Sequence, residues 1–218
     1  MSKRVVMVVG AGPGVSGSVA RRFAAEGYDV ALVGLDDEVL GTLTEELGGP
    51  DTAVRTAIAD LTDPQQSRAA IGALAEQCGR VDVLHFNPSA FREKDPLELT
   101  VDELLADIAL GVGALLTAVQ AVRPYLREGA RITVTGSMAA DKPWNRAASL
   151  GVQKAGVRNL VRSIDTTLRD DGVRAVSVTV RGSLAREGAF TPDRVAEAIY
   201  AAATQDEGSW ATEVPYEG

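Results

Sequence analysis

Six short runs of apolar, mostly β-branched residues recur along this chain, and longer amphipathic segments separate them. Each run is continuous rather than alternating, which is typical of strands buried on both faces of a parallel sheet. The runs are RVVMVV from Arg4, DVALVG from Asp29, TAVRTAIA from Thr52, VDVLHF from Val81, RITVTG from Arg131 and VRAVSVTV from Val173.

The segments between these runs have the spacing of helices that face a core. They cover Val15 to Glu26, Glu38 to Leu47, Pro64 to Cys78, Val101 to Arg127 and Arg146 to Arg169, and a last helix follows Thr191. Strands that alternate with helices predict an α/β fold with a doubly wound parallel sheet, whose ligands bind at the carboxyl ends of the strands. With 218 residues, the chain has the length of one domain, residues 1–218.

Composition narrows the class of protein. Hydrophobic residues make up 45% and charged residues 24%, which is typical of a soluble globular domain. The net charge of −8 disfavours a nucleic-acid partner. No stretch reaches the ~18 uninterrupted apolar residues of a membrane span, and we predict no signal peptide. One cysteine, Cys78, fits a reducing compartment. We expect a cytoplasmic protein with a small-molecule substrate and no metal site.

A glycine-rich turn, VVGAGPGVSG, follows the first apolar run and opens the first helix. Glycines there let the backbone approach a pyrophosphate, which the helix N-terminus stabilises. Two frames fit: GxGxxG beginning at Gly12, and GxxxGxS beginning at Gly10. A simple strand-to-helix turn is the alternative. The predicted phosphate contacts are Gly10, Pro13, Gly14 and Val15.

Three later motifs follow the third, fourth and fifth runs: ADLTDP, VDVLHFNPSA and RITVTGSMA. With the glycine turn, they make the chain resemble the short-chain dehydrogenase/reductase family from Arg4 to about Leu184. The resemblance implies a Rossmann fold and an NAD(P)-dependent oxidoreductase. It places Asp60 and Leu61 beside the adenine and Asn87 at the cofactor, and it makes Ser137 the catalytic serine.

The family's catalytic set is incomplete in this chain. A tyrosine is expected 13 residues after the serine, at position 150, where this chain has leucine, and the lysine four residues later is present as Lys154. The tyrosine exchanges a proton with the substrate oxygen, which Leu150 cannot do. The family's asparagine aligns near Gly111. The resemblance leaves Ser137 and Lys154 as catalytic residues, and it lets Lys154 bind the nicotinamide ribose.

Other groups are candidates for the missing acid or for substrate binding. His85 lies near the end of the fourth run, and its ordinary pKa suits proton transfer. A core histidine is the alternative interpretation. In the loop after the fifth run, Trp144 is a candidate apolar wall and Arg146 a candidate anion site, against an ordinary polar loop.

The end of the second run bears on the choice of cofactor. NAD-type members of the resembled family carry an acidic residue there, and Asp36 stands two residues beyond Gly34. An acidic side chain binds the ribose hydroxyls and repels a 2′-phosphate, so NAD(H) is preferred over NADP(H). After the sixth run the chain passes almost directly to its last helix, so the substrate lid is shortened.

The resemblance also implies assembly. In the family, the two long helices form a four-helix interface, and small residues in this chain permit close helix contact: Ala114, Ala118, Ala147 and Ala155. A homodimer or homotetramer is expected. Two other functions remain open beside the oxidoreductase. One is a non-redox isomerase, cyclase or lyase on the same scaffold, and the other is a non-catalytic dinucleotide-binding protein.

Overall fold

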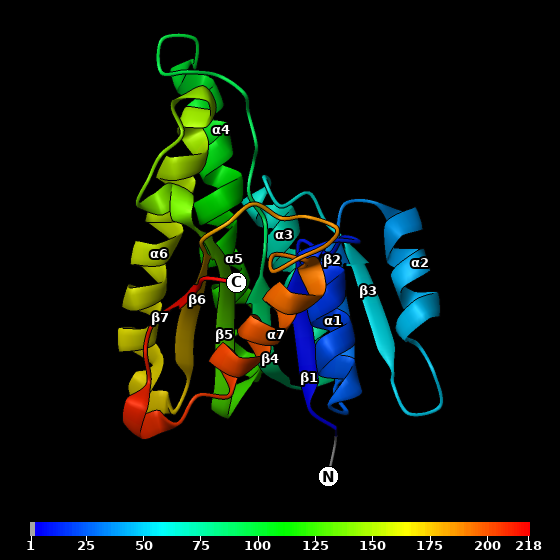
Figure 1. Cartoon of the computed structure of the whole chain (residues 1–218). Helices are drawn as coiled ribbons and strands as arrows, with labels where there is room; N and C mark the ends of the chain where they lie inside the picture. The colour runs from blue at the N-terminus through cyan, green and yellow to red at the C-terminus, as the bar shows by residue number, and fades with distance from the viewer. Residues whose placement is uncertain (1–2) are drawn as a thin grey trace.

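In the computed structural model, which describes residues 3–218, parallel strands form one sheet in the order β3-β2-β1-β4-β5-β6-β7 (Figure 1). The strands are β1 Val5–Val9, β2 Asp29–Gly34, β3 Val54–Ile58, β4 Val81–Phe86, β5 Leu126–Ser137, β6 Arg174–Val180 and β7 Glu213–Tyr216. All neighbouring pairs are parallel. The chain reverses its direction of winding between β1 and β4, and ligands of such sheets bind at this point.

Helices cover both faces of the sheet. They are α1 Val15–Ala25, α2 Asp37–Leu47, α3 Pro64–Cys78, α4 Val101–Ile108, α5 Ala114–Val122, α6 Ala148–Leu168 and α7 Pro192–Ala203. One core lies between the sheet and α1, α2 and α7, and the other lies between the sheet and α3, α5 and α6. Every residue of β1 is buried, as continuous apolar runs predict. The predicted doubly wound, single-domain α/β fold is confirmed.

The single helix predicted from Val101 to Arg127 is confirmed as far as Tyr125, but its middle and its end are not α-helical. A π-helical turn, Ala109–Gly113, separates α4 from α5. Helix α5 ends at Val122, because Pro124 has no backbone N–H to continue it. The run Val101–Tyr125 is long and apolar enough to cross a membrane, since an 18-residue window within it has a mean hydropathy of 1.8. Half of that window is buried inside the fold, however, which is typical of a core helix.

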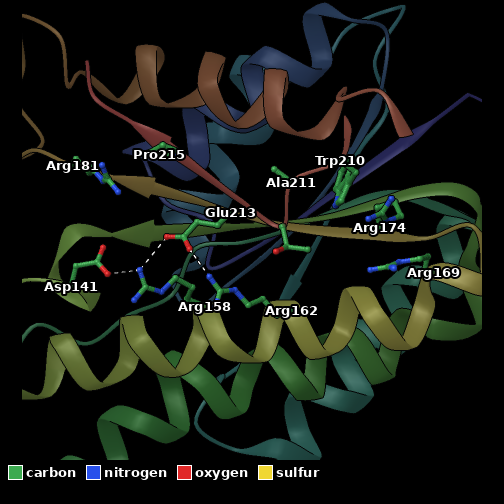
Figure 2. Close-up of a pocket in the computed structure, with 11 residues that line it drawn as sticks. Asp141, Arg158, Arg162, Arg169, Arg174, Arg181, Trp210, Ala211, Glu213 and Pro215 are labelled. Carbon is green, nitrogen blue, oxygen red and sulfur yellow. Dashed lines mark hydrogen bonds and ion pairs between the residues drawn. The ribbon is translucent and has the colours of Figure 1, made fainter. Parts of the chain in front are cut away.

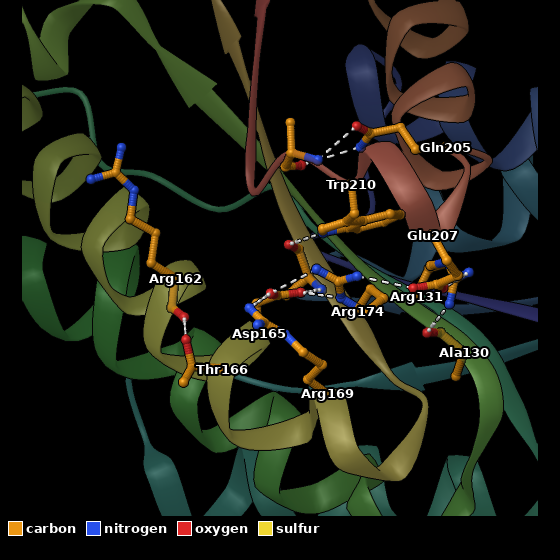
Figure 3. Close-up of polar contacts among 12 residues, drawn as sticks. Ala130, Arg131, Arg162, Asp165, Thr166, Arg169, Arg174, Gln205, Glu207 and Trp210 are labelled. Carbon is orange, nitrogen blue, oxygen red and sulfur yellow. Dashed lines mark hydrogen bonds and ion pairs between the residues drawn. The ribbon is translucent and has the colours of Figure 1, made fainter.

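The C-terminal strand β7 was missed by sequence reasoning. It is short and contains Pro215, which is tolerated because β7 lies at the edge of the sheet. The segment before β7 is held by a buried ion pair (Figure 3). Arg174 donates to both carboxylate oxygens of Asp165, at 2.9 and 3.1 Å, and Trp210 lies over its guanidinium group. These contacts join α6, β6 and the chain leading to β7.

Residues 181–191 connect β6 directly to α7, as the predicted shortened lid requires. This connection arches over the carboxyl ends of the strands as the orange loop of Figure 1. Gly182 lies against the ring of Phe190, and a Cβ at Gly182 would be 2.4 Å from that ring. The close approach folds the loop back onto itself.

Candidate active site

A cavity of about 760 Å³ forms a groove between α6 and β7 (Figure 2). Its wall contains Arg158, Arg162, Arg169, Arg174 and Arg181. All five arginines pair with carboxylates. Glu213, for example, accepts from Arg158 at 3.1 Å and from Arg162 at 3.0 Å. The groove has no excess of unpaired positive charge, and none of the predicted site residues lines it.

A second pocket, of about 420 Å³, lies at the carboxyl ends of the central strands, where β1 and β4 diverge. It brings together six positions that the sequence singled out: Gly14, Val15, Asn87, Ser137, Leu150 and Lys154. It adds residues that sequence reasoning missed: Ser89, Phe91, Thr135, Gly136, Val180, Gly182 and Leu184. Among its lining side chains, only Lys154 carries an ionisable group in the normal pH range.

The glycine turn meets this pocket through Gly14. Gly10 has a φ of +82°, and a Cβ there would be 2.6 Å from Cγ of Pro88, so the fold requires glycine. Gly14 has a φ of −80°, and a Cβ there would contact nothing within 4 Å. Helix α1 begins directly after Gly14 without a side-chain cap. Open space before uncapped backbone amides at a helix start fits a pyrophosphate.

The predicted adenine-side residues follow β2 and β3 and lie outside the 420 Å³ pocket. Asp36 caps α2 by accepting from two backbone N–H groups at 2.9 and 3.2 Å. Asp60 accepts from the hydroxyl and the N–H of Thr62, and these hydrogen bonds lower its pKa. Leu61 packs against the core, whereas Pro13 is exposed.

Lys154 and Leu150 lie one turn apart on α6 and face the same pocket. The Lys154 side chain is buried, and its Nζ donates to the carbonyl oxygen of Thr135 at 2.9 Å. Burial lowers the pKa of Lys154 from 10.5 to about 8, because the ammonium ion loses hydration. Ser137 ends β5, and its Oγ accepts from the N–H of Ala139 at 3.2 Å.

His85 does not reach the pocket, so the hypothesis that it replaces the acid is wrong. Its ring is fully buried in the sheet, where Nδ1 lies 2.9 Å from Oγ1 of Thr133 and Nε2 lies 3.4 Å from Oγ1 of Thr135. Burial, with a contribution from Lys154, lowers the pKa of His85 to about 3. A neutral imidazole enclosed by two threonines has no proton to give at neutral pH.

Trp144 and Arg146 also lie outside this pocket, so neither residue lines the site formed by Ser137 and Lys154. Arg146 is exposed and forms an ion pair with Glu93. Trp144 lines a separate apolar pocket of about 540 Å³ and stacks on Phe91 at a ring distance of 6.3 Å. Phe91 also lines the Ser137–Lys154 pocket, so it lies between the two pockets. Within residues 3–218, no three His, Cys, Asp or Glu side chains are grouped as a metal site would need.

Similarity to known proteins identifies the family to which a chain with this pocket belongs. The family model described as short chain dehydrogenase matches residues 4–184. This chain belongs to that family. Among curated relatives, sulfoacetaldehyde reductase 2 of Chromohalobacter salexigens is 32% identical over 181 residues, covering 80% of this chain and 70% of the relative. Oxidoreductase asL5 of Sarocladium schorii is 29% identical over 192 residues, covering 86% and 74%.

Solved structures of similar proteins have the same fold as this chain. A short-chain dehydrogenase from Burkholderia cenocepacia in complex with NADP is 25% identical, with a TM-score of 0.90 over 100% of this chain and 97% of that one. A dehydrogenase/reductase from Sinorhizobium meliloti, at 21% identity and a TM-score of 0.88, covers 99% and 94% and shows the same fold. The protein is therefore an oxidoreductase of the short-chain dehydrogenase family.

Proposed function

We propose that this protein is an NAD(H)-dependent oxidoreductase for a small carbonyl or alcohol substrate, in which Lys154 replaces tyrosine as the proton donor. The observation that carries the proposal is the pocket where Ser137 and Lys154 meet Leu150. The same pocket begins at the glycine turn and at Asn87, where a dinucleotide binds in this fold. Its walls include apolar side chains of Phe91, which is exposed, and Leu150, which favours a small, weakly polar substrate.

Different residues of the chain bind the cofactor, orient the substrate and supply the proton. The amides at the start of α1 bind the pyrophosphate, and a reduced nicotinamide supplies the hydride when it is bound. Ser137 donates a hydrogen bond to the substrate oxygen. Lys154 holds a proton on Nζ and transfers it to that oxygen as negative charge develops there. A pKa of about 8 suits this role, because a general acid works best when its pKa is near the working pH.

The preference for NAD(H) rests on Asp36 at the end of β2. Its carboxylate is exposed beside Leu35, and Ile58 of the neighbouring strand pairs with Gly34. Leu35 and Ile58 are 71% and 53% exposed, so they offer an apolar surface to an adenine ring. A carboxylate repels a 2′-phosphate, which an NADP-type site neutralises with arginine.

Gly14→Asp is expected to abolish dinucleotide binding. The aspartate places bulk and negative charge where the pyrophosphate is proposed to lie, while the open space around Gly14 lets the protein fold. Calorimetry with NADH and NADPH on the wild type and this variant is the measurement. Gly14→Ala is the control and should bind more tightly than Gly14→Asp. A wild-type protein that binds neither dinucleotide at millimolar concentration would reject the proposed function.

We also propose that the protein is a homodimer or homotetramer. Three of the four small residues noted above are buried within the protomer, so they do not form a contact surface. Large apolar side chains are exposed on α4, α5 and α6 instead: Val101, Leu105, Leu116 and Val152. Light scattering at micromolar concentration is expected to give at least twice the protomer mass. Leu105→Glu with Leu116→Glu should shift that mass toward the monomer, and a monomeric wild type would contradict the proposal.

A further inference from the structure

The π-helical turn between α4 and α5 contains a glycine that the backbone itself does not need. Gly111 lies in the middle of this turn, is buried and does not have a positive φ. A Cβ at Gly111 would nevertheless be 2.3 Å from Oε1 and 2.9 Å from Cδ of Gln153. A residue larger than glycine at position 111 would therefore force the side chain of Gln153 to move. This contact lies at a π turn, and such turns are frequent at functional sites.

Gln153 uses the space that Gly111 leaves. Its side chain is fully buried, one residue before Lys154 on α6. Its Oε1 accepts from the backbone N–H of Ala90 at 2.9 Å, and its Nε2 donates to the carbonyl oxygen of Ala90 at 3.1 Å. The carboxamide thus holds both backbone polar groups of one residue. Because these groups are part-buried, breaking the contacts would leave costly unpaired donors and acceptors.

Ala90 stands between two residues that line the pocket. Ser89 and Phe91 flank it, and Asn87 lines the pocket three residues earlier. This segment follows β4 and has no regular secondary structure. The two hydrogen bonds to Ala90 therefore attach this wall of the pocket to α6, the helix that also carries Lys154. An attachment of this kind sets the distance between the wall and the lysine.

We propose that Gln153 is a positioning residue. Its side chain occupies the space that a side chain at residue 111 would need, and its hydrogen bonds to Ala90 hold the segment from Asn87 to Phe91 at a fixed distance from Lys154. The proposal rests on the proposed function only for its effect on turnover. The polar group that holds Ala90 comes from α6, and Gly111 makes room for it.

Gln153→Met tests the attachment, because methionine keeps the volume and removes both hydrogen bonds. The amide of Ala90 is expected to exchange with deuterium at least tenfold faster than in the wild type, while amides of β1 and β5 keep their rates. If a carbonyl substrate is turned over, its KM should rise by about tenfold or more, since small misplacements of a site wall are costly. Gln120→Met makes the same change on the exposed surface of α5, and it should alter neither the exchange rate of the Ala90 amide nor the KM.

A pair of alanine substitutions tests whether the side chain of Gln153 on α6 occupies the space beside Gly111. Gly111→Ala alone should lower the melting temperature, because its Cβ collides with Gln153. In a Gln153→Ala background the same change should have little effect, so the two substitutions are strongly non-additive. Additive effects, or an Ala90 amide that exchanges at the wild-type rate in Gln153→Met, would overturn the proposal. Exchange and melting need no cofactor, so a failed dinucleotide titration would reject the proposed function without deciding this inference.

Discussion

Leu150→Tyr is expected to raise turnover of activated ketones, but by less than the ~10²–10⁴-fold of a positioned acid acting alone, because Lys154 already supplies a proton. Leu150 faces the pocket one helical turn before Lys154, and Ser137 lines the same pocket. A phenol at position 150 would therefore stand beside the ammonium group, which lowers the pKa of the phenol and prepares it to donate a proton. Initial rates with NADH, measured on the wild type and the variant, are the test.

Leu150→Phe is the matched control. It adds the same ring without the hydroxyl group, so any change it causes comes from bulk, and overpacking alone costs stability. Dinucleotide affinity is measured for all three proteins, so that a rate change is not mistaken for a binding change. A wild type that already turns over ketones rapidly, with Leu150→Phe equally active, would show that tyrosine is not needed here. Such a result would leave Lys154 as the acid, since His85 is enclosed in the sheet.

Lys154→Met is expected to lower turnover by about 10²–10⁴-fold, because it removes the proposed proton donor. Lys154→Arg is the second variant, and it separates the positive charge of the side chain from its ability to donate a proton. Arginine keeps the positive charge for the nicotinamide ribose but stays protonated at every working pH, so it does not donate its proton. Lys154→Arg should therefore retain more dinucleotide affinity than Lys154→Met while remaining equally inactive. Full activity in Lys154→Met would eliminate the lysine from the chemistry.

The pH dependence follows from the pKa of Lys154, which burial lowers from its ordinary value of 10.5 to about 8 in the folded protein. Carbonyl reduction needs the ammonium form, so its rate should fall as pH rises through about 8. The free energy of unfolding changes with pH in the opposite direction to the rate. The unfolded chain binds this proton more tightly, so the buried ammonium destabilises the fold below pH 8, and stability rises with pH between about 8 and 10.5. Lys154→Met should then melt at a higher temperature than the wild type at pH 7, which separates lost catalysis from lost folding.

Three results separate the competing functions. Turnover of a carbonyl compound with NADH supports the oxidoreductase with an altered proton donor. Dinucleotide binding without turnover of any carbonyl or alcohol would favour a non-catalytic dinucleotide-binding protein. Conversion of a substrate with no change in bound dinucleotide would favour the isomerase, cyclase or lyase. The first outcome is read from the absorbance of NADH, the second from calorimetry and the third from chromatography of the substrate and its product.

Much of the fold was predictable because burial leaves a direct trace in local composition. Strands buried on both faces of a parallel sheet must be continuously apolar, so β1 and β6 were recognisable from their β-branched runs. The bounds of α3, Pro64 to Cys78, were predicted correctly, and Asp63 caps the start of this helix by accepting from two backbone N–H groups. Strand β7 leaves a weaker trace, because an edge strand is short, partly exposed and tolerant of Pro215.

Parts of the site were predictable for a related reason. Parallel strands bring their carboxyl ends to one edge, so residues that follow successive strands meet there. Gly14 after β1, Asn87 after β4 and Ser137 at the end of β5 accordingly line one pocket. The spacing along α6 carries Lys154 and Leu150 to the same place. Sequence order and the rules of the α/β fold were sufficient for these positions.

Tertiary structure alone decided which neighbouring side chains serve the pocket. His85 is near the end of β4, but the strand turns its ring into the sheet, where Thr133 and Thr135 enclose it. The carboxamide of Gln153 lies where a side chain at residue 111 would have to be, although the two residues are far apart in the chain. Local patterns report which residues are buried, because burial selects composition. They do not report which buried polar atoms face each other, since that depends on how the two helices pack together.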